Sequence, residues 1–256
     1  MTWPFQAIFA GEIESLMPCP ASIALGEWAR GIVADEFGPQ PERLAPADFR
    51  EALSRARAAV AEEQGRRLVC QLLRDLEVPV EGVLLDAVRL RAISPGLERV
   101  PEAAPAFYAH RDTWYGNPKA QVNGWLPLID VDERDSFRFY LDDFAHAVEN
   151  DSDSFEVAHF EARGGFGRTT SDPVSAYPRA LKSSDSRTWD VVLQQDALLL
   201  FSAAHLHQTL PNRKATVRFS LDFRFLRQSD LQAGNGAPDP DNRSRGCVTA
   251  SYHRCG

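Results

Sequence analysis

The sequence predicts a mainly β fold of the antiparallel sandwich or barrel type, preceded by helices. Two observations predict it. An apolar period of three and four residues is concentrated in the first 80 residues, and short strand-like runs separated by turn-rich stretches follow. Most of these runs have no helical pattern between them, which argues against alternating strands and helices. We expect one domain over residues 1–228, with mostly helical support in 1–80 and the sheets in 81–228.

Composition narrows the class of protein. The chain has 256 residues, 44% of them apolar and 25% charged, which is typical of a globular protein with a sizeable core. Its net charge of −8 disfavours binding to nucleic acid or anionic lipid. No apolar run approaches the roughly 20 residues that cross a bilayer. We therefore expect a cytoplasmic protein that binds neither nucleic acid nor membranes, while its oligomeric state stays unknown.

The N-terminal part is expected to be helical. Prolines in residues 1–45 break long helices and predict short ones there. From Asp48 to Leu76 the apolar positions recur at helical spacing, with Asp48 as a plausible N-cap and Gly65 as a point that divides the segment into two helices.

The β part is expected to contain strands in six runs, followed by a tail. The tail, 229–256, is rich in Gly, Pro, Asp, Asn and Ser, and we expect it to be loosely ordered. The predicted strand runs are 83–93, 120–128, 136–140, 189–193, 197–202 and 216–225.

The cysteines do not form a disulfide framework in the sequence. Cys19, Cys70, Cys247 and Cys255 are few and scattered, so reduced thiols are expected. Cys247, His253 and Cys255 offer three possible zinc ligands in one short segment, but without a paired cysteine motif a mobile tail is the better interpretation.

Three side chains form a candidate metal site. His110 and Asp112 lie two residues apart, which places both on one side of an extended segment. His207 follows the predicted strand 197–202 and could supply the third ligand. Two imidazoles and one carboxylate occupy one face of an octahedral Fe(II) and leave the opposite face for exchangeable ligands. His205 is the rival third ligand, because strand alternation alone does not separate it from His207.

The predicted strand 216–225 has an unusual polar face. Its apolar side chains alternate with Arg218, Ser220, Asp222 and Arg224. A guanidinium binds a carboxylate through two parallel hydrogen bonds, and a neighbouring hydroxyl can add a third. Arg218 and Ser220 would suit the distal carboxylate of a metal-bound keto acid such as 2-oxoglutarate.

The order and spacing of these residues resemble the Fe(II)/2-oxoglutarate-dependent oxygenases, especially the phytanoyl-CoA dioxygenase-like branch. The resemblance covers residues 108–225 and rests on His110-x-Asp112, on His207 five residues before Asn212, and on Arg218-x-Ser220. Gln195 departs from it, because many relatives have a glycine before the aspartate that follows.

The resemblance implies a double-stranded β-helix, the jelly roll of cupin-like proteins. It also implies that His110, Asp112 and His207 are the catalytic iron ligands, with Arg218 and Ser220 holding the cosubstrate. Such an enzyme uses Fe(II), dioxygen and 2-oxoglutarate to oxidise, most simply to hydroxylate, a small organic molecule, and releases succinate and CO₂.

Other residues are candidates for the surroundings of the metal. Gln121 and Asn123 share a strand face and could bond the cosubstrate, or could satisfy neighbouring backbone. The remaining candidates are for the substrate: Trp114 and Tyr115 as pocket walls or as core, and Arg89 and Arg91 as substrate cations or as a salt-bridged ladder.

Two further functions fit a metal site in such a fold. The metal could act as a Lewis acid in a cupin-type isomerase or hydrolase without redox chemistry. The chain could also be a non-catalytic module that binds a small molecule. Arg218 discriminates, since neither alternative needs a guanidinium across from the metal.

Overall fold

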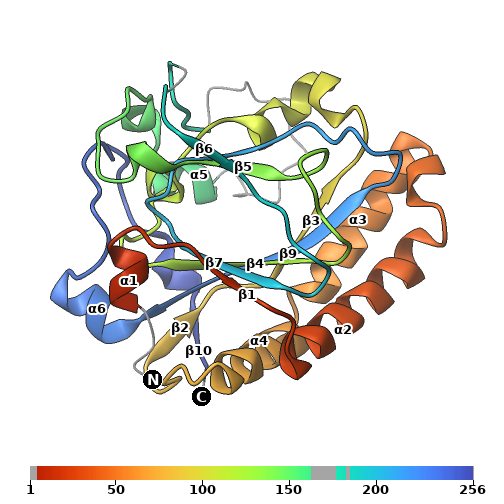
Figure 1. Cartoon of the computed structure of the whole chain (residues 1–256), viewed down its shortest axis with the longest axis horizontal. Helices are drawn as coiled ribbons and strands as arrows, with labels where there is room; N and C mark the ends of the chain where they lie inside the picture. Colours follow the sequence, from red (N-terminus) through yellow and green to blue (C-terminus); the bar gives the residue numbers. More distant parts are fainter. Residues whose placement is uncertain (1–4, 163–176, 183–184, 256) are drawn as a thin grey trace.

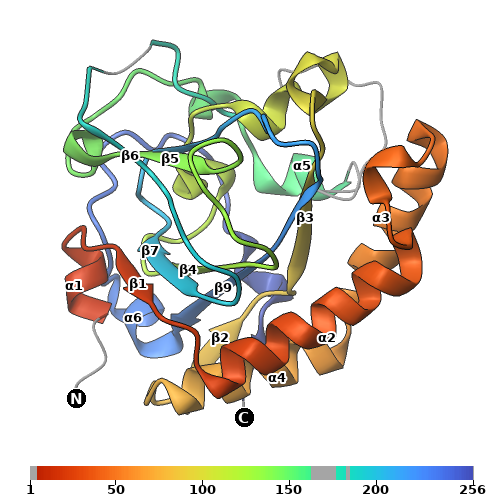
Figure 2. The same ribbon diagram turned by 45° about the vertical axis from the view of Figure 1, so that its right-hand side comes forward.

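The structure is a computed structural model, and it describes residues 5–162, 177–182 and 185–255. Two antiparallel sheets form its centre, and helices pack against one of them (Figures 1 and 2). The strands are β1 Glu14–Leu16, β2 Val83–Leu85, β3 Arg89–Ile93, β4 Val122–Pro127, β5 Phe137–Tyr140, β6 Thr188–Asp190, β7 Leu198–Ser202, β8 His207–Thr209, β9 Arg218–Arg227 and β10 His253–Arg254. The mainly β class with N-terminal helices is confirmed.

The larger sheet has the order β1-β7-β4-β9-β2-β10, with β3 also paired to β9, and the smaller sheet has the order β6-β5-β8. Each predicted run overlaps at least one strand. The run 83–93 is split into β2 and β3 by residues 86–88, where the carboxylate of Asp86 accepts from the backbone of Ala87 and pairs with Arg89. The short strands β1, β8 and β10 were not expected, since two or three residues show no alternation.

The helices are α1 Phe5–Phe9, α2 Pro20–Phe37, α3 Pro46–Val60, α4 Glu63–Asp75, α5 Val157–Ala162 and α6 Gln228–Ala233. The expectation of only short helices before residue 45 is wrong, because α2 has 18 residues. Pro20 occupies its first turn, where a missing N–H costs nothing, and Pro39 lies beyond its end.

The start of α3 also differs from the expectation. Its N-cap is Ala45, so Asp48 lies in the first turn rather than at the cap. The division between α3 and α4 falls at residues 61–62, and Gly65 lies inside α4. A β-carbon at Gly65 would lie 2.3 Å from the carbonyl oxygen of Val60, so glycine permits the close approach of the two helices.

The sheet residues alternate between two environments. The apolar side chains of β9 and β4, such as Leu221, Phe223 and Val122, join the buried core beneath α2, α3 and α4. A second buried cluster joins Trp125 and Phe201 of the larger sheet to Phe139 of the smaller one. The polar face of β9 therefore lies on the side of the smaller sheet, away from the helices.

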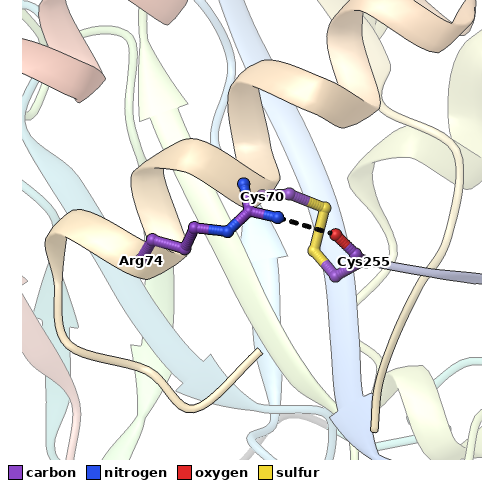
Figure 3. The surroundings of a disulfide bond; sticks show 3 residues. All are labelled: Cys70, Arg74 and Cys255. Carbon is purple, nitrogen blue, oxygen red and sulfur yellow. Dashed lines mark hydrogen bonds between the residues drawn. A yellow bond between two sulfur atoms is a disulfide. The ribbon is translucent and has the colours of Figure 1, made fainter. Parts of the chain in front are cut away.

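A disulfide joins Cys70 of α4 to Cys255 near the C-terminus (Figure 3). The Cα atoms are 5.5 Å apart although 185 residues separate them. β10 pairs with β2, and Arg74 bonds the carbonyl of Cys255 at 3.1 Å. The expectation of four reduced thiols is therefore wrong for this pair, and Cys255 is not available as a zinc ligand; Cys19 and Cys247 are free.

We expected residues 229–256 to be loosely ordered, whereas the structure packs the described part, 229–255, against the domain. Asp241 is buried and accepts hydrogen bonds from Arg111 Nε at 3.2 Å and from Trp114 Nε1 at 2.8 Å. The polar composition of the tail thus supplies partners for buried polar groups rather than a solvated coil.

The described helices include none that is both long enough and apolar enough to span a membrane.

Candidate metal centre

The backbones of His110 and His207 form an isolated antiparallel bridge. Each N–H donates to the carbonyl oxygen of the other residue at 2.9 Å. Residues that face each other in this way carry their side chains on the same side of the ladder. The two imidazole centroids accordingly lie 4.4 Å apart.

Asp112 completes the group from the other side of an extended residue. Arg111 has φ −105° and ψ 142°, and Asp112 begins the 3₁₀ helix Asp112–Tyr115. Alternation therefore holds although only part of this segment is extended. Oδ1 of Asp112 lies 3.5 Å from Nε2 of His110, and each of His110, Asp112 and His207 offers one possible ligand atom within 4.8 Å of the others.

Both imidazoles are oriented by backbone carbonyls. Nδ1 of His110 lies 2.8 Å from the oxygen of Tyr108, and Nδ1 of His207 lies 3.0 Å from the oxygen of His205. Since a carbonyl only accepts, the proton belongs on Nδ1 and the lone pair on Nε2 is free for a metal. Burial, with the neighbouring His110, lowers the pKa of His207 to about 4, which keeps it in the neutral form that binds metals.

Asp112 is held as a carboxylate. Burial alone would raise its pKa, but the charge of Arg224 and the neighbouring imidazoles of His110 and His207 outweigh burial and hold the pKa well below its usual range. Nη2 of Arg224 lies 3.5 Å from Oδ2, and Asn123 donates to the same oxygen at 2.9 Å. Oδ1 is thus the oxygen left for a metal.

From the sequence, Asn123 was expected to bond the cosubstrate or neighbouring backbone, and the structure shows a contact with Asp112 that the sequence did not predict. Its amide bonds Asp112, and Gln121 in turn donates to Oδ1 of Asn123 at 2.7 Å. Arg224 was placed on the polar face without a role. Asn123 pairs with Arg224 across β4 and β9, and this register brings both to one carboxylate. The strand pattern fixes the face but not the register.

His205, the rival ligand, is not part of the group. Its ring is buried, and its Nδ1 and Nε2 lie 3.3 Å and 3.1 Å from the carbonyl oxygens of Ser202 and Gly11. Both of its nitrogens therefore face backbone carbonyl oxygens rather than the side chains of His110 and Asp112.

Arg218 and Ser220 lie on the polar face of β9 and are 3% and 0% exposed. Nη1 of Arg218 donates to the carbonyl of Asp135 at 2.9 Å. Among the described residues, Nε of Arg218 and Oγ of Ser220 have no hydrogen-bond partner. Burial lowers the pKa of Arg218 to about 10, so the group is still a cation near neutral pH. A buried cation and hydroxyl with free hydrogen-bonding capacity fit a carboxylate ligand.

The four candidate substrate residues differ in their surroundings. Trp114 is 0% exposed and bonded to Asp241, so the structure places it in the core. The ring of Tyr115 lies 5.0 Å from that of His110, beside the three possible ligands His110, Asp112 and His207, which we call the metal group. Arg89 and Arg91 share the metal-facing side of the sheet, where they pair with Asp86 at 2.6 Å and Asp222 at 2.5 Å.

Comparison with known proteins places the fold. No family model and no curated protein matches the chain in sequence. Among solved structures, EvdO2 from Micromonospora carbonacea var. aurantiaca is 10% identical with a TM-score of 0.53, over 89% of this chain and 91% of that one. The chain shares the EvdO2 fold. One EvdO2 structure is a complex with 2-oxoglutarate.

Two other similar structures carry descriptions of their chemistry. SnoN, a non-heme alpha ketoglutarate dependent epimerase, is 13% identical with a TM-score of 0.48, over 93% of this chain and 94% of that one. ThoJ, a non-heme monooxygenase, is 15% identical with a TM-score of 0.48, over 87% of this chain and 77% of that one.

Proposed function

We propose that this chain is a non-heme Fe(II)/2-oxoglutarate-dependent dioxygenase that oxidises, most simply hydroxylates, a small organic molecule. One observation carries the proposal: the group His110, Asp112 and His207 faces the polar side of the larger sheet, where Nε of Arg218 and Oγ of Ser220 are buried without a hydrogen-bond partner among the described residues. We also propose that the two sheets form a double-stranded β-helix of the cupin-like kind and that residues 1–228 are one oxygenase domain.

The metal ligands would be Nε2 of His110, Nε2 of His207 and Oδ1 of Asp112. Their backbone and side-chain partners fix them before any metal binds, since both Nδ1 atoms face carbonyls and Oδ2 faces Asn123. This donor set of two imidazoles and one carboxylate is the one that non-heme Fe(II) oxygenases use.

Arg218 and Ser220 would hold the distal carboxylate of 2-oxoglutarate. The free Nε of Arg218 and Oγ of Ser220 can each donate to a carboxylate oxygen, and the bound anion would offset the cost of a buried cation. When both are bound, iron and 2-oxoglutarate together activate dioxygen, and the cosubstrate leaves as succinate and CO₂.

The substrate would approach from the side of Tyr115, Arg91 and Asp222. The pair of Arg91 and Asp222 is partly exposed on the metal-facing side, at 42% and 21% for the two side chains. It offers a cation and an anion to polar groups of a substrate. Arg89 is less open and lies against Asp86, where it supports the sheet.

The unfilled Arg218 favours an oxygenase over the two alternatives. A Lewis-acid isomerase or hydrolase, or a plain binding module, gains nothing from a buried guanidinium with an unused donor, which costs stability in the free protein.

The test is the visible absorption of the anaerobic complex. Fe(II) and 2-oxoglutarate added to apoprotein should give a metal-to-ligand charge-transfer band. Arg218→Ala should raise the 2-oxoglutarate dissociation constant by about tenfold or more, because it removes a charge-assisted pair. Arg138→Ala is the matched control, since Arg138 pairs with Asp190 in the smaller sheet. Absence of the band from folded, metal-loaded protein would eliminate the oxygenase.

A further inference from the structure

Three hydrogen bonds in series connect the C-terminal segment to the metal group. The hydroxyl of Tyr252 donates to Oε1 of Gln121 at 2.6 Å, and Nε2 of Gln121 donates to Oδ1 of Asn123 at 2.7 Å. Nδ2 of Asn123 then donates to Oδ2 of Asp112 at 2.9 Å. Gln121 is 0% exposed and Asn123 5% exposed, so these amides have little water to bond instead.

The series has a direction that begins at the phenol. A carboxylate accepts only, so Asn123 must present its NH₂ to Asp112, and its oxygen must then face a donor. Gln121 supplies that donor only if its own oxygen faces Tyr252. Burial, aided by the charge of Asp86, raises the pKa of Tyr252 well above its usual value, which keeps the hydroxyl a donor.

We propose that Tyr252 is a positioning residue for the metal site, acting through Gln121 and Asn123 to fix the carboxylate of Asp112. The proposal rests on the proposed function only in taking Asp112 as a metal ligand. Without the phenol, either amide can rotate by 180°, and a rotated Asn123 would turn its oxygen toward the carboxylate, where the two acceptors repel each other.

The three residues that follow Tyr252 are held against the rest of the domain. His253 and Arg254 pair with β2, and the backbone N–H of Cys255 donates to the oxygen of Val83 at 3.1 Å. The disulfide to Cys70 of α4 closes this end (Figure 3). The pairing of β10 with β2 and the disulfide at Cys255 both lie within three residues of Tyr252, and together they hold Tyr252 beside Gln121. Through Tyr252, the C-terminal segment therefore helps to fix the side chains that surround Asp112.

The chain contains a matched control for this bond. The hydroxyl of Tyr140 donates to Oε1 of Gln208 at 2.6 Å, the same donor, acceptor and length as for Tyr252 and Gln121. Gln208 donates onward to the carbonyl oxygen of Phe107 at 3.0 Å, and no hydrogen bond among the described residues leads from this pair to Asp112. A Tyr→Phe change at either position removes one hydroxyl and one hydrogen bond.

The experiment measures the affinity of apoprotein for Co(II) by calorimetry, without 2-oxoglutarate or turnover. Removing a partner of a metal ligand typically costs ten- to a hundredfold in metal affinity, so Asn123→Ala should raise the dissociation constant by about that factor. Tyr252→Phe, two hydrogen bonds further out, should raise it roughly three- to tenfold. Tyr140→Phe should leave it unchanged.

A double variant separates positioning from a general loss of stability. If Tyr252 acts through Asn123, adding Tyr252→Phe to Asn123→Ala should cause no further loss of Co(II) affinity. A full additional penalty in that background would overturn the proposal, as would an unchanged affinity in Tyr252→Phe alone. Should Tyr252→Phe fail to fold, Gln121→Met interrupts the series from the other side and should give the same weakened affinity; wild-type affinity there would refute the series.

The outcome is independent of the oxygenase test. Co(II) affinities that follow the series, together with no charge-transfer band, would retain Tyr252 as a positioning residue and reject the oxygenase. A normal band with equal Co(II) affinity in all variants would do the reverse.

Discussion

Nε2 of His205 lies 3.1 Å from the carbonyl oxygen of Gly11, a residue 194 positions earlier in the chain. Its Nδ1 lies 3.3 Å from the oxygen of Ser202, and its ring packs 4.4 Å from that of Phe144. His207 faces a carbonyl only through Nδ1. This difference in backbone contacts separates two histidines that strand alternation leaves equivalent.

The first prediction concerns these two histidines. His207→Phe should abolish tight Co(II) binding to the apoprotein, because it removes one of three ligands. His205→Phe should keep the affinity and lower the free energy of unfolding by about 1 kcal/mol for the lost hydrogen bond. Calorimetry and urea unfolding of both variants check this. Metal binding that survives in His207→Phe but not in His205→Phe would reverse the assignment.

The second prediction is a loss of stability in acid. Burial lowers the pKa of His205 from 6.5 to about 4, so between these values the unfolded chain binds more protons than the folded one. The free energy of unfolding must then fall as pH falls through this window, by roughly 2 kcal/mol between pH 7 and 5 for this one group.

Urea unfolding of the apoprotein at several pH values measures the effect. In His205→Phe the free energy of unfolding should fall less between pH 7 and 5, because the contribution of His205 is gone. The contribution of His207, whose pKa is lowered in the same direction, should remain. An identical pH dependence in wild type and variant would show that His205 does not titrate in this window.

The third prediction concerns the disulfide. Unfolded protein without reductant should show two reactive thiols, Cys19 and Cys247, and four after reduction. Because the bond closes a loop of 185 residues, loss of the constraint on the unfolded chain should lower the free energy of unfolding by up to about 5 kcal/mol.

Serine variants provide the control for the disulfide. Cys70→Ser and Cys255→Ser should each cause the loss of stability, and Cys19→Ser and Cys247→Ser should cause little. In a reducing compartment the bond would be subject to opening. Four thiols in unreduced protein would disprove the pairing.

The fourth prediction tests the C-terminal segment. Asp241→Asn leaves the guanidinium of Arg111, which is 0% exposed, without its anionic partner. Breaking a buried ion pair in this way costs about 3–5 kcal/mol. Asp239→Asn is the nearby comparison and leaves the pair of Arg111 and Asp241 in place. Thermal unfolding of the two variants checks the difference, and equal stability would contradict the packed tail.

The sequence was sufficient to predict what depends on local pattern. The alternation in β9 predicted a polar face with Arg218 and Ser220, and the extended segment around Arg111 predicted that His110 and Asp112 share a side. Both follow from a two-residue period that any strand obeys. To predict the group His110, Asp112 and His207, the only further requirement was that the segment of His207 lies beside the segment of His110.

What the sequence could not predict depends on pairings between distant segments. The register that sets Asn123 beside Arg224, the disulfide between Cys70 and Cys255, and the bond from Tyr252 to Gln121 join residues far apart in the chain. Residues 229–255 lack an apolar period, and several of their contacts are polar ones made to buried groups. Periodicity detects an apolar face and misses such contacts.

The bridge between His110 and His207 is made entirely by main-chain atoms. The backbone position of these two residues therefore does not depend on their side chains. A different side chain at position 110 or 207 would begin from the same Cα position. Replacing an imidazole by a thiolate would shift the preference toward softer ions such as zinc, while the scaffold around it is retained. The protein thus offers a template on which selectivity for a metal could be redesigned by exchanging single ligands.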